Sequence, residues 1–248
     1  MNIIIPMAGL GSRFATSGFT LPKPLIQVAG KAMYRHAVDC LPLNLATKLV
    51  FILRQSEFVE DLKKDIEVYY QSPYECKIII LDQDTRGQAE TVLKSASVLD
   101  LSAPSLIHNC DTYISPDIAW QEAIDRNAVG LLVLFNSQEQ RWSYAKLDDQ
   151  NNKIIDVQEK KVISPHASSG TYFFKNTITL LDNIRKIIQQ DYRENGEYYL
   201  STVYRLMIDQ QLHLRPIWSD PMLCFGTPQD LVHSLNKILL NDSLKKVF

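Results

Sequence analysis

The sequence feature that most constrains the fold is a regular alternation of short apolar runs with amphipathic stretches over the first 135 residues. The runs are apolar on both faces, as in buried parallel strands, and the stretches between them have helical periodicity. Strands are expected at 3–5, 49–53, 77–81, 105–110 and 130–135, and helices at 32–41, 57–70, 87–99 and 116–127. This order predicts an α/β fold whose helix-covered parallel sheet binds ligands beyond the C-terminal strand ends.

The alternation changes after Phe135. The later strands are expected at 144–147, 154–157, 171–174 and 213–218, the helices at 177–190, 197–209 and 228–240, and a polar hairpin turn at 148–153. No Gly/Ser linker or block of charge divides the chain. We therefore expect one domain, 1–248, in which residues 137–248 elaborate the first half, 1–136, and end in a closing helix.

Composition excludes several classes of protein. The chain is 46% hydrophobic and 22% charged, with a formal charge of −2, which argues against nucleic-acid or anionic-membrane binding. No apolar stretch approaches the roughly 20 residues needed to span a bilayer. The four cysteines are far apart and do not predict a zinc site, and Cys76 and Cys110, in or beside apolar runs, are expected to be core thiols in a reducing cytoplasm. No histidine has a nearby nucleophile, so a hydrolase triad is not expected.

A glycine-containing loop follows the first expected strand. Gly9 and Gly11 would let backbone N–H groups approach an oxyanion closely, Arg13 adds a fork of donors, and Lys23 adds a movable charge. On these residues alone, a triphosphate cradle and an ordinary strand-to-helix turn are equally compatible with the loop. The loop lacks the third glycine of a dinucleotide fingerprint and the Gly-Lys-Ser/Thr of a P-loop.

Two further strand ends carry candidate chemistry. After 77–81, the amides of Gln83 and Gln88 could read a base edge, and Gly87 would allow close backbone approach. A polar loop is the alternative. After 105–110, Asp111 stands where Mg²⁺ would bridge substrate phosphates, although a turn or helix-capping aspartate is the alternative.

The string from Ala8 to Phe14, followed by Pro22 to Leu25, resembles the signature of the sugar-1-phosphate nucleotidyltransferases. Further segments resemble that family, in family order, as far as about residue 230. The resemblance implies a three-layer, Rossmann-like fold of the nucleotide-diphospho-sugar transferase type, with a mixed, mainly parallel sheet and helices on both faces. It also implies a nucleotide-binding first half and an acceptor-binding second half.

The same resemblance implies transfer of NMP from an NTP to a phosphorylated acceptor, with release of pyrophosphate. Carried over by motif, the catalytic residues are Arg13, Lys23 and Asp111, and Asp111 holds Mg²⁺. The nucleotide-binding residues are Ala8, Gly9, Gly11, Ser12, Gln83, Gly87 and Gln88. The acceptor-binding residues are Tyr144, Glu159, Lys160, Gly170 and Glu197. For Glu159 and Lys160, a solvated pair is the alternative, and Glu197 could equally be a helix-terminus carboxylate.

One position departs from the family pattern. The family commonly has a metal-binding aspartate two residues before Gly-Thr, where this chain has Cys224. A thiol is a poor Mg²⁺ ligand. Either Asp220 or Glu197 substitutes, or one protein carboxylate holds the ion together with phosphates and water.

Two other functions are kept as alternatives. A nucleotide-sugar-dependent glycosyltransferase shares the architecture but usually has Asp-x-Asp, of which this chain has only Asp111. A non-catalytic nucleotide-binding regulator is suggested by Cys224. The expected partners are an NTP and a phosphorylated small molecule, and a homo-oligomer is left open. The expected role is precursor supply for surface or capsular polysaccharide in the cytoplasm; the base and the acceptor are not indicated.

Overall fold

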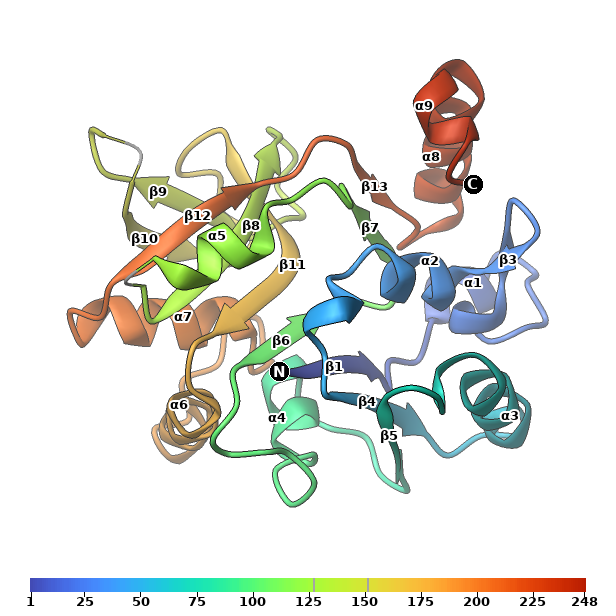
Figure 1. Cartoon of the computed structure of the whole chain (residues 1–248), viewed down its shortest axis with the longest axis horizontal. Coiled ribbons are helices and arrows are strands. Elements are labelled where there is room, and N and C mark those ends of the chain that lie inside the picture. Colours follow the sequence, from blue (N-terminus) through green and yellow to red (C-terminus); the bar gives the residue numbers. More distant parts are fainter. Residues whose placement is uncertain (127, 151) are drawn as a thin grey trace.

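The fold is built on a nine-stranded mixed sheet, seen in the computed structural model, which describes residues 1–126, 128–150 and 152–248 (Figure 1). Its strands are β1 (Asn2–Met7), β4 (Lys48–Arg54), β5 (Glu75–Leu81), β6 (Ser105–His108), β8 (Gly130–Asn136), β9 (Tyr144–Leu147), β10 (Ile154–Gln158), β11 (His166–Phe174) and β12 (Leu214–Trp218). Two small ladders pair β2 (Gln27–Val28) with β3 (Lys31–Ala32) and β7 (Thr112–Ile114) with β13 (Met222–Cys224).

Helices cover both faces of the sheet, as expected. They are α1 (Ser12–Ala15), α2 (Met33–Asp39), α3 (Val59–Tyr70), α4 (Gln88–Leu93), α5 (Trp120–Asp125), α6 (Thr177–Gln189), α7 (Leu200–Asp209), α8 (Pro228–Leu240) and α9 (Asp242–Lys245), with 3₁₀ turns at Lys23–Leu25 and Leu43–Leu45. In β1, Ile3 and Ile5 pack into a core with α2, α3 and α8, whereas Ile4 packs on the opposite face with α4, α6 and α7. Burial on both faces explains why β1 is apolar throughout.

The first four strands of the expected sheet are parallel neighbours. β1 lies between β4 and β6, and β4 pairs with β5, all in parallel register. Figure 1 shows β1, where the chain begins, in the middle of the sheet. The C-terminal ends of β1 and β6 therefore open at the same edge, as the sequence predicts.

The fifth apolar run does not simply extend this parallel row. β11 lies between β6 and β8 and is antiparallel to both. Because β11 is nine residues long and almost wholly buried, it can pair along both neighbours, and it shifts register between Ser168 and Tyr172. A strand from the second half of the chain thus joins the two halves in one sheet.

Several element bounds differ from the expectations. α4 and α5 are shorter than the expected helices, and α7 begins at Leu200 rather than at residue 197. The expected helix 116–127 ends at Asn127, which lies outside the described residues, as does Asn151 of the turn 148–153. β9 and β10 form the expected hairpin, and Asp148 Oδ1 accepts the backbone N–H of Asn152 at 2.8 Å. In the described part of the chain, no helix is both long and apolar enough to cross a membrane.

Candidate active site

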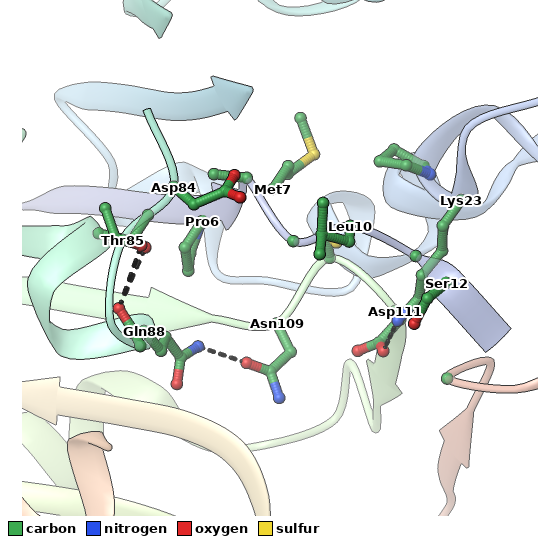
Figure 2. A pocket seen from close by; sticks show the side chains of 18 of the residues that line it. Pro6, Met7, Leu10, Ser12, Lys23, Asp84, Thr85, Gln88, Asn109 and Asp111 are labelled. Carbon is green, nitrogen blue, oxygen red and sulfur yellow. Dashed lines mark hydrogen bonds and ion pairs between the residues drawn. The ribbon is translucent and has the colours of Figure 1, made fainter. Parts of the chain in front are cut away.

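A cavity of about 630 Å³ opens beyond the C-terminal ends of β1 and β6 (Figure 2). It brings together ten of the residues selected from the sequence: Ala8, Gly9, Gly11, Ser12, Arg13, Lys23, Gly87, Gln88, Asp111 and Glu197. These residues come from three strand-end loops and from the segment before α7. The cavity therefore lies at the strand ends where the sequence predicts ligand binding.

The loop after β1 is shaped by Gly11 and anchored by Phe14. Gly11 has φ of +61°, in the left-handed region, and its carbonyl accepts the backbone N–H of Phe14 at 3.0 Å. The Phe14 ring is buried in the core and meets Phe19 edge-on at 5.1 Å. A Cβ on Gly11 would lie 3.2 Å from Cβ of Lys23. Glycine therefore serves both the turn and the close approach of Lys23.

Lys23 and Asp111 form an ion pair at the floor of the cavity. The Lys23 ammonium donates to Asp111 Oδ2, and each side chain is about one-fifth exposed, at 20% and 18%. Burial, the largest single influence, would lower the pKa of Lys23, but the charge and hydrogen bond of Asp111, together with the neighbouring Cys110 and Cys224, raise that pKa above its ordinary value. Burial likewise opposes ionisation of Asp111, and the charge of Lys23 lowers the Asp111 pKa. Both groups are charged at neutral pH.

The surroundings of Asp111 bear on whether a divalent cation could bind there. The Asp111 carboxylate is a suitable ligand for such a cation, and the nearby Cys224 thiol is not. A Cβ added to Gly226 would lie 3.2 Å from both Asp111 Oδ2 and Cys224 Sγ, so glycine leaves this point beside the carboxylate open. Burial raises the pKa of the Cys224 thiol, which stays protonated and is not a ligand for Mg²⁺. Of the two substitutes considered from the sequence, Glu197 lines the cavity and Asp220 does not. Among the described residues, no three His, Cys, Asp or Glu side chains form a metal cluster.

The segment before α4 supplies a second wall. Gly87 has φ of +129°, and a Cβ there would overlap the backbone of Tyr198, which bonds to the segment on both sides of Gly87. Gln88 Nε2 donates to Asn109 Oδ1 at 2.5 Å, as Figure 2 shows. Gln83 is exposed and does not line the cavity, whereas Asp84 does. The base-reading role of Gln83 stays a prediction that the cavity does not support.

Asn109 is a site residue that the sequence interpretation did not assign. It lines the cavity, accepts the Gln88 amide and packs directly against Gly170, where a Cβ would overlap the Asn109 amide. The available signal was its position at the same strand end as Asp111, two residues earlier. Gly170 itself has φ of +80° and is buried under this amide.

The remaining acceptor candidates lie outside the cavity lining, on β9 to β11 and nearby segments. Glu159 Oε2 accepts the hydroxyls of Ser143 at 2.5 Å and Ser201 at 2.7 Å. Lys160 donates to the Tyr199 hydroxyl at 2.8 Å, and this bond raises the Lys160 pKa. Tyr144 is fully buried, and its hydroxyl donates to the Glu139 carbonyl at 2.7 Å. The Tyr144 side chain is thus part of the core, and its contact with an acceptor stays a prediction.

Comparisons with known proteins agree with this arrangement. The family model described as "Nucleotidyl transferase" matches residues 2–239. The chain is 26% identical, over 96% of its length, to the bifunctional protein GlmU of Methanococcus maripaludis and 25% identical, over 93%, to a mannose-1-phosphate guanyltransferase of Schizosaccharomyces pombe. It spans 56% and 62% of the length of these curated relatives.

One solved structure is matched over nearly its whole length, unlike the curated relatives. The nucleoside-diphosphate-sugar pyrophosphorylase from Vibrio cholerae RC9 superposes with a TM-score of 0.82 at 26% identity. The match covers 94% of this chain and 99% of that protein's chain. The mixed sheet with helices on both faces is therefore an arrangement that this chain shares with solved relatives.

Proposed function

The chain belongs to the nucleotidyl transferase family, and we propose that it transfers NMP from an NTP to a phosphorylated acceptor and releases pyrophosphate. The observation that carries the proposal is the convergence of the loop from Gly9 to Arg13, Lys23 and Asp111 on one cavity. The loop offers backbone N–H groups, Lys23 a cation and Asp111 a carboxylate. This set of groups is suited to a polyphosphate with a divalent cation.

In the proposed reaction, an oxygen of the acceptor phosphate attacks the α-phosphorus of the NTP. The bond from the α-phosphorus to the bridging oxygen of the β-phosphate breaks, and pyrophosphate leaves with that electron pair. No covalent enzyme intermediate is needed, so the chain mainly positions the two phosphates and neutralises their charge. A bound Mg²⁺ would supply further neutralisation of the triphosphate, held at Asp111.

Each cationic residue has one role in this proposal. The loop from Gly9 to Arg13 holds the β- and γ-phosphates, and Arg13 stabilises the leaving pyrophosphate. Lys23 neutralises the α-phosphate. Lys160 orients the attacking phosphate, and Glu159 holds hydroxyls of the acceptor. Lys23 already lies beside Gly11 of the loop, which supports this role.

The acceptor is proposed to be a sugar 1-phosphate or a similar phosphorylated alcohol. The names of the relatives support a sugar phosphate, since one is a mannose-1-phosphate guanyltransferase and another an NDP-sugar pyrophosphorylase. We further propose that residues 1–248 work as one domain in the cytoplasm, where NTPs are available. The product would serve the synthesis of surface polysaccharides.

Pyrophosphate release tests the proposal. The chain is incubated with Mg²⁺, each of ATP, CTP, GTP, UTP and dTTP, and a panel of sugar 1-phosphates and phosphorylated alcohols. The expected result is pyrophosphate release that requires both one NTP and one acceptor. A glycosyltransferase would instead consume an NDP-sugar without releasing pyrophosphate. A non-catalytic regulator would show Mg-NTP binding by thermal shift but no release with any acceptor.

A further inference from the structure

Asp230 is a carboxylate beside the cavity that the sequence interpretation did not select. It lies in the first turn of α8, where its backbone N–H donates to the capping Thr227 hydroxyl at 3.0 Å. Its side chain is only 11% exposed. Oδ1 pairs with the Arg141 guanidinium at 2.6 Å, and Oδ2 accepts a hydrogen bond from the Cys224 thiol at 3.7 Å. The helix cap uses only the Asp230 backbone, and the carboxylate is directed towards Arg141 and Cys224.

One open point is shared by Asp230, Asp111 and Cys224. A Cβ added to Gly226 would lie 3.4 Å from Asp230 Oδ2, 3.2 Å from Asp111 Oδ2 and 3.2 Å from Cys224 Sγ. Glycine at 226 leaves this space free of side-chain atoms. Two carboxylate oxygens from separate elements and the Cys224 sulfur therefore all lie within 3.4 Å of this one position.

We propose that Asp230 supplies the second protein carboxylate of a divalent-cation site whose first carboxylate is Asp111. The proposal rests on the proposed function, because nucleotidyl transfer is the reason to expect such a cation. Asp230 would thereby do the work of the acid that the family pattern has at position 224, where this chain has a cysteine.

The charges around the two carboxylates support this assignment. Each carboxylate already has a cation, since Lys23 binds Asp111 and Arg141 binds Asp230. Lys23 occupies the same Asp111 oxygen that faces the open point, as a metal ion would. Mg²⁺ commonly uses one or two protein carboxylates and completes its six ligands with phosphate oxygens and water. A cation bound between Asp111 and Asp230 would release Lys23 towards the α-phosphate.

Binding of Mn²⁺ alone, followed by electron paramagnetic resonance into the millimolar range, tests the proposal without nucleotide or turnover. Asp230→Asn should weaken Mn²⁺ binding at least about tenfold, because even partners outside the coordination sphere cost that much. Arg141→Met is the matched control: it breaks the same ion pair but keeps the carboxylate. Mn²⁺ binding should stay within about twofold of the wild type, because the Arg141 end of the pair is partly exposed and such pairs contribute little. Thermal unfolding of each variant confirms that it is folded.

A rescue variant distinguishes a ligand from a purely structural residue. Adding Cys224→Asp to Asp230→Asn should restore Mn²⁺ binding, because it returns a carboxylate to the open point. The proposal is overturned if Asp230→Asn binds Mn²⁺ like the wild type, if Arg141→Met loses as much affinity, or if the wild type binds no Mn²⁺. Pyrophosphate release from one NTP and its acceptor tests the proposed function separately and does not depend on any of these outcomes.

Discussion

At the scale of single residues, the amide of Asn109 shows how the candidate site is fixed by close packing. Gln88 donates to Asn109, and Gly170 beneath it has φ of +80° with no room for a Cβ. Gly196 has a similar φ of +84° but nothing within 4 Å of the position of a Cβ. Substitutions at these two glycines therefore distinguish the cost of backbone strain, which both share, from the cost of steric overlap, which only Gly170 has.

Gly170→Ala should destabilise the chain more than Gly196→Ala does. Both alanines bear the cost of a left-handed backbone, about 1–2 kcal/mol, but only alanine at 170 displaces the Asn109 amide. The extra loss of unfolding free energy should be about 1–3 kcal/mol, as for overpacked sites. Urea unfolding of the two variants measures the difference. Equal losses would mean that Asn109 moves aside freely.

At the scale of elements, helix α2 packs against the C-terminal residues of the chain through His36. His36 on α2 is buried, bonds to the Val28 carbonyl at 2.7 Å and stacks on Phe248 at 4.4 Å. Burial lowers the pKa of His36 to about 4, from an ordinary value of 6.5. His108 on β6 is also buried, which lowers its pKa to about 4. Both histidines are therefore neutral in the folded chain at neutral pH.

These two histidines should make the fold sensitive to mild acid. Because their folded pKa values are below the unfolded value, their contribution to stability is complete above pH 6.5 and is lost as the pH falls towards 4. Each can cost up to about 3 kcal/mol. Unfolding free energies measured between pH 7 and pH 4.5 should fall less steeply for His36→Gln than for the wild type. Gln at the exposed His233 is the control and should leave the slope unchanged.

At the scale of the whole molecule, local patterns predict the parallel centre of the sheet but not its completion. The apolar runs of β1 and β4 are buried because both faces carry helices, and that burial is visible in the sequence. The run of β5 is equally apolar, but β5 is the edge strand and is only partly buried. The insertion of β11 between β6 and β8 depends on pairing between distant segments, which no local pattern encodes.

The candidate site follows the same division. The loops that follow neighbouring parallel strands lie at the same edge of the sheet. Gly11, Lys23 and Asp111 could therefore be predicted from the sequence as neighbours in one site. The position of Gln83 outside the cavity could not be predicted. The path of the segment before α4 depends on backbone hydrogen bonds to Tyr198, a residue far away in the sequence. Asp230 was hidden because a carboxylate in the first turn of a helix is ordinarily a cap.

Turnover of an α-³²P-labelled NTP with its acceptor, compared between the wild type and two lysine variants, tests the assignment of the site most directly. Lys31 is the matched control, because it forms an ion pair with Asp39 at 2.7 Å and does not line the cavity. We expect the label to move into the NDP-linked product, Lys31→Ala to retain the wild-type rate, and Lys23→Ala to lose at least about 100-fold, the scale of one lost electrostatic contact in a transition state. Label transfer by Lys23→Ala at the wild-type rate would contradict the assignment.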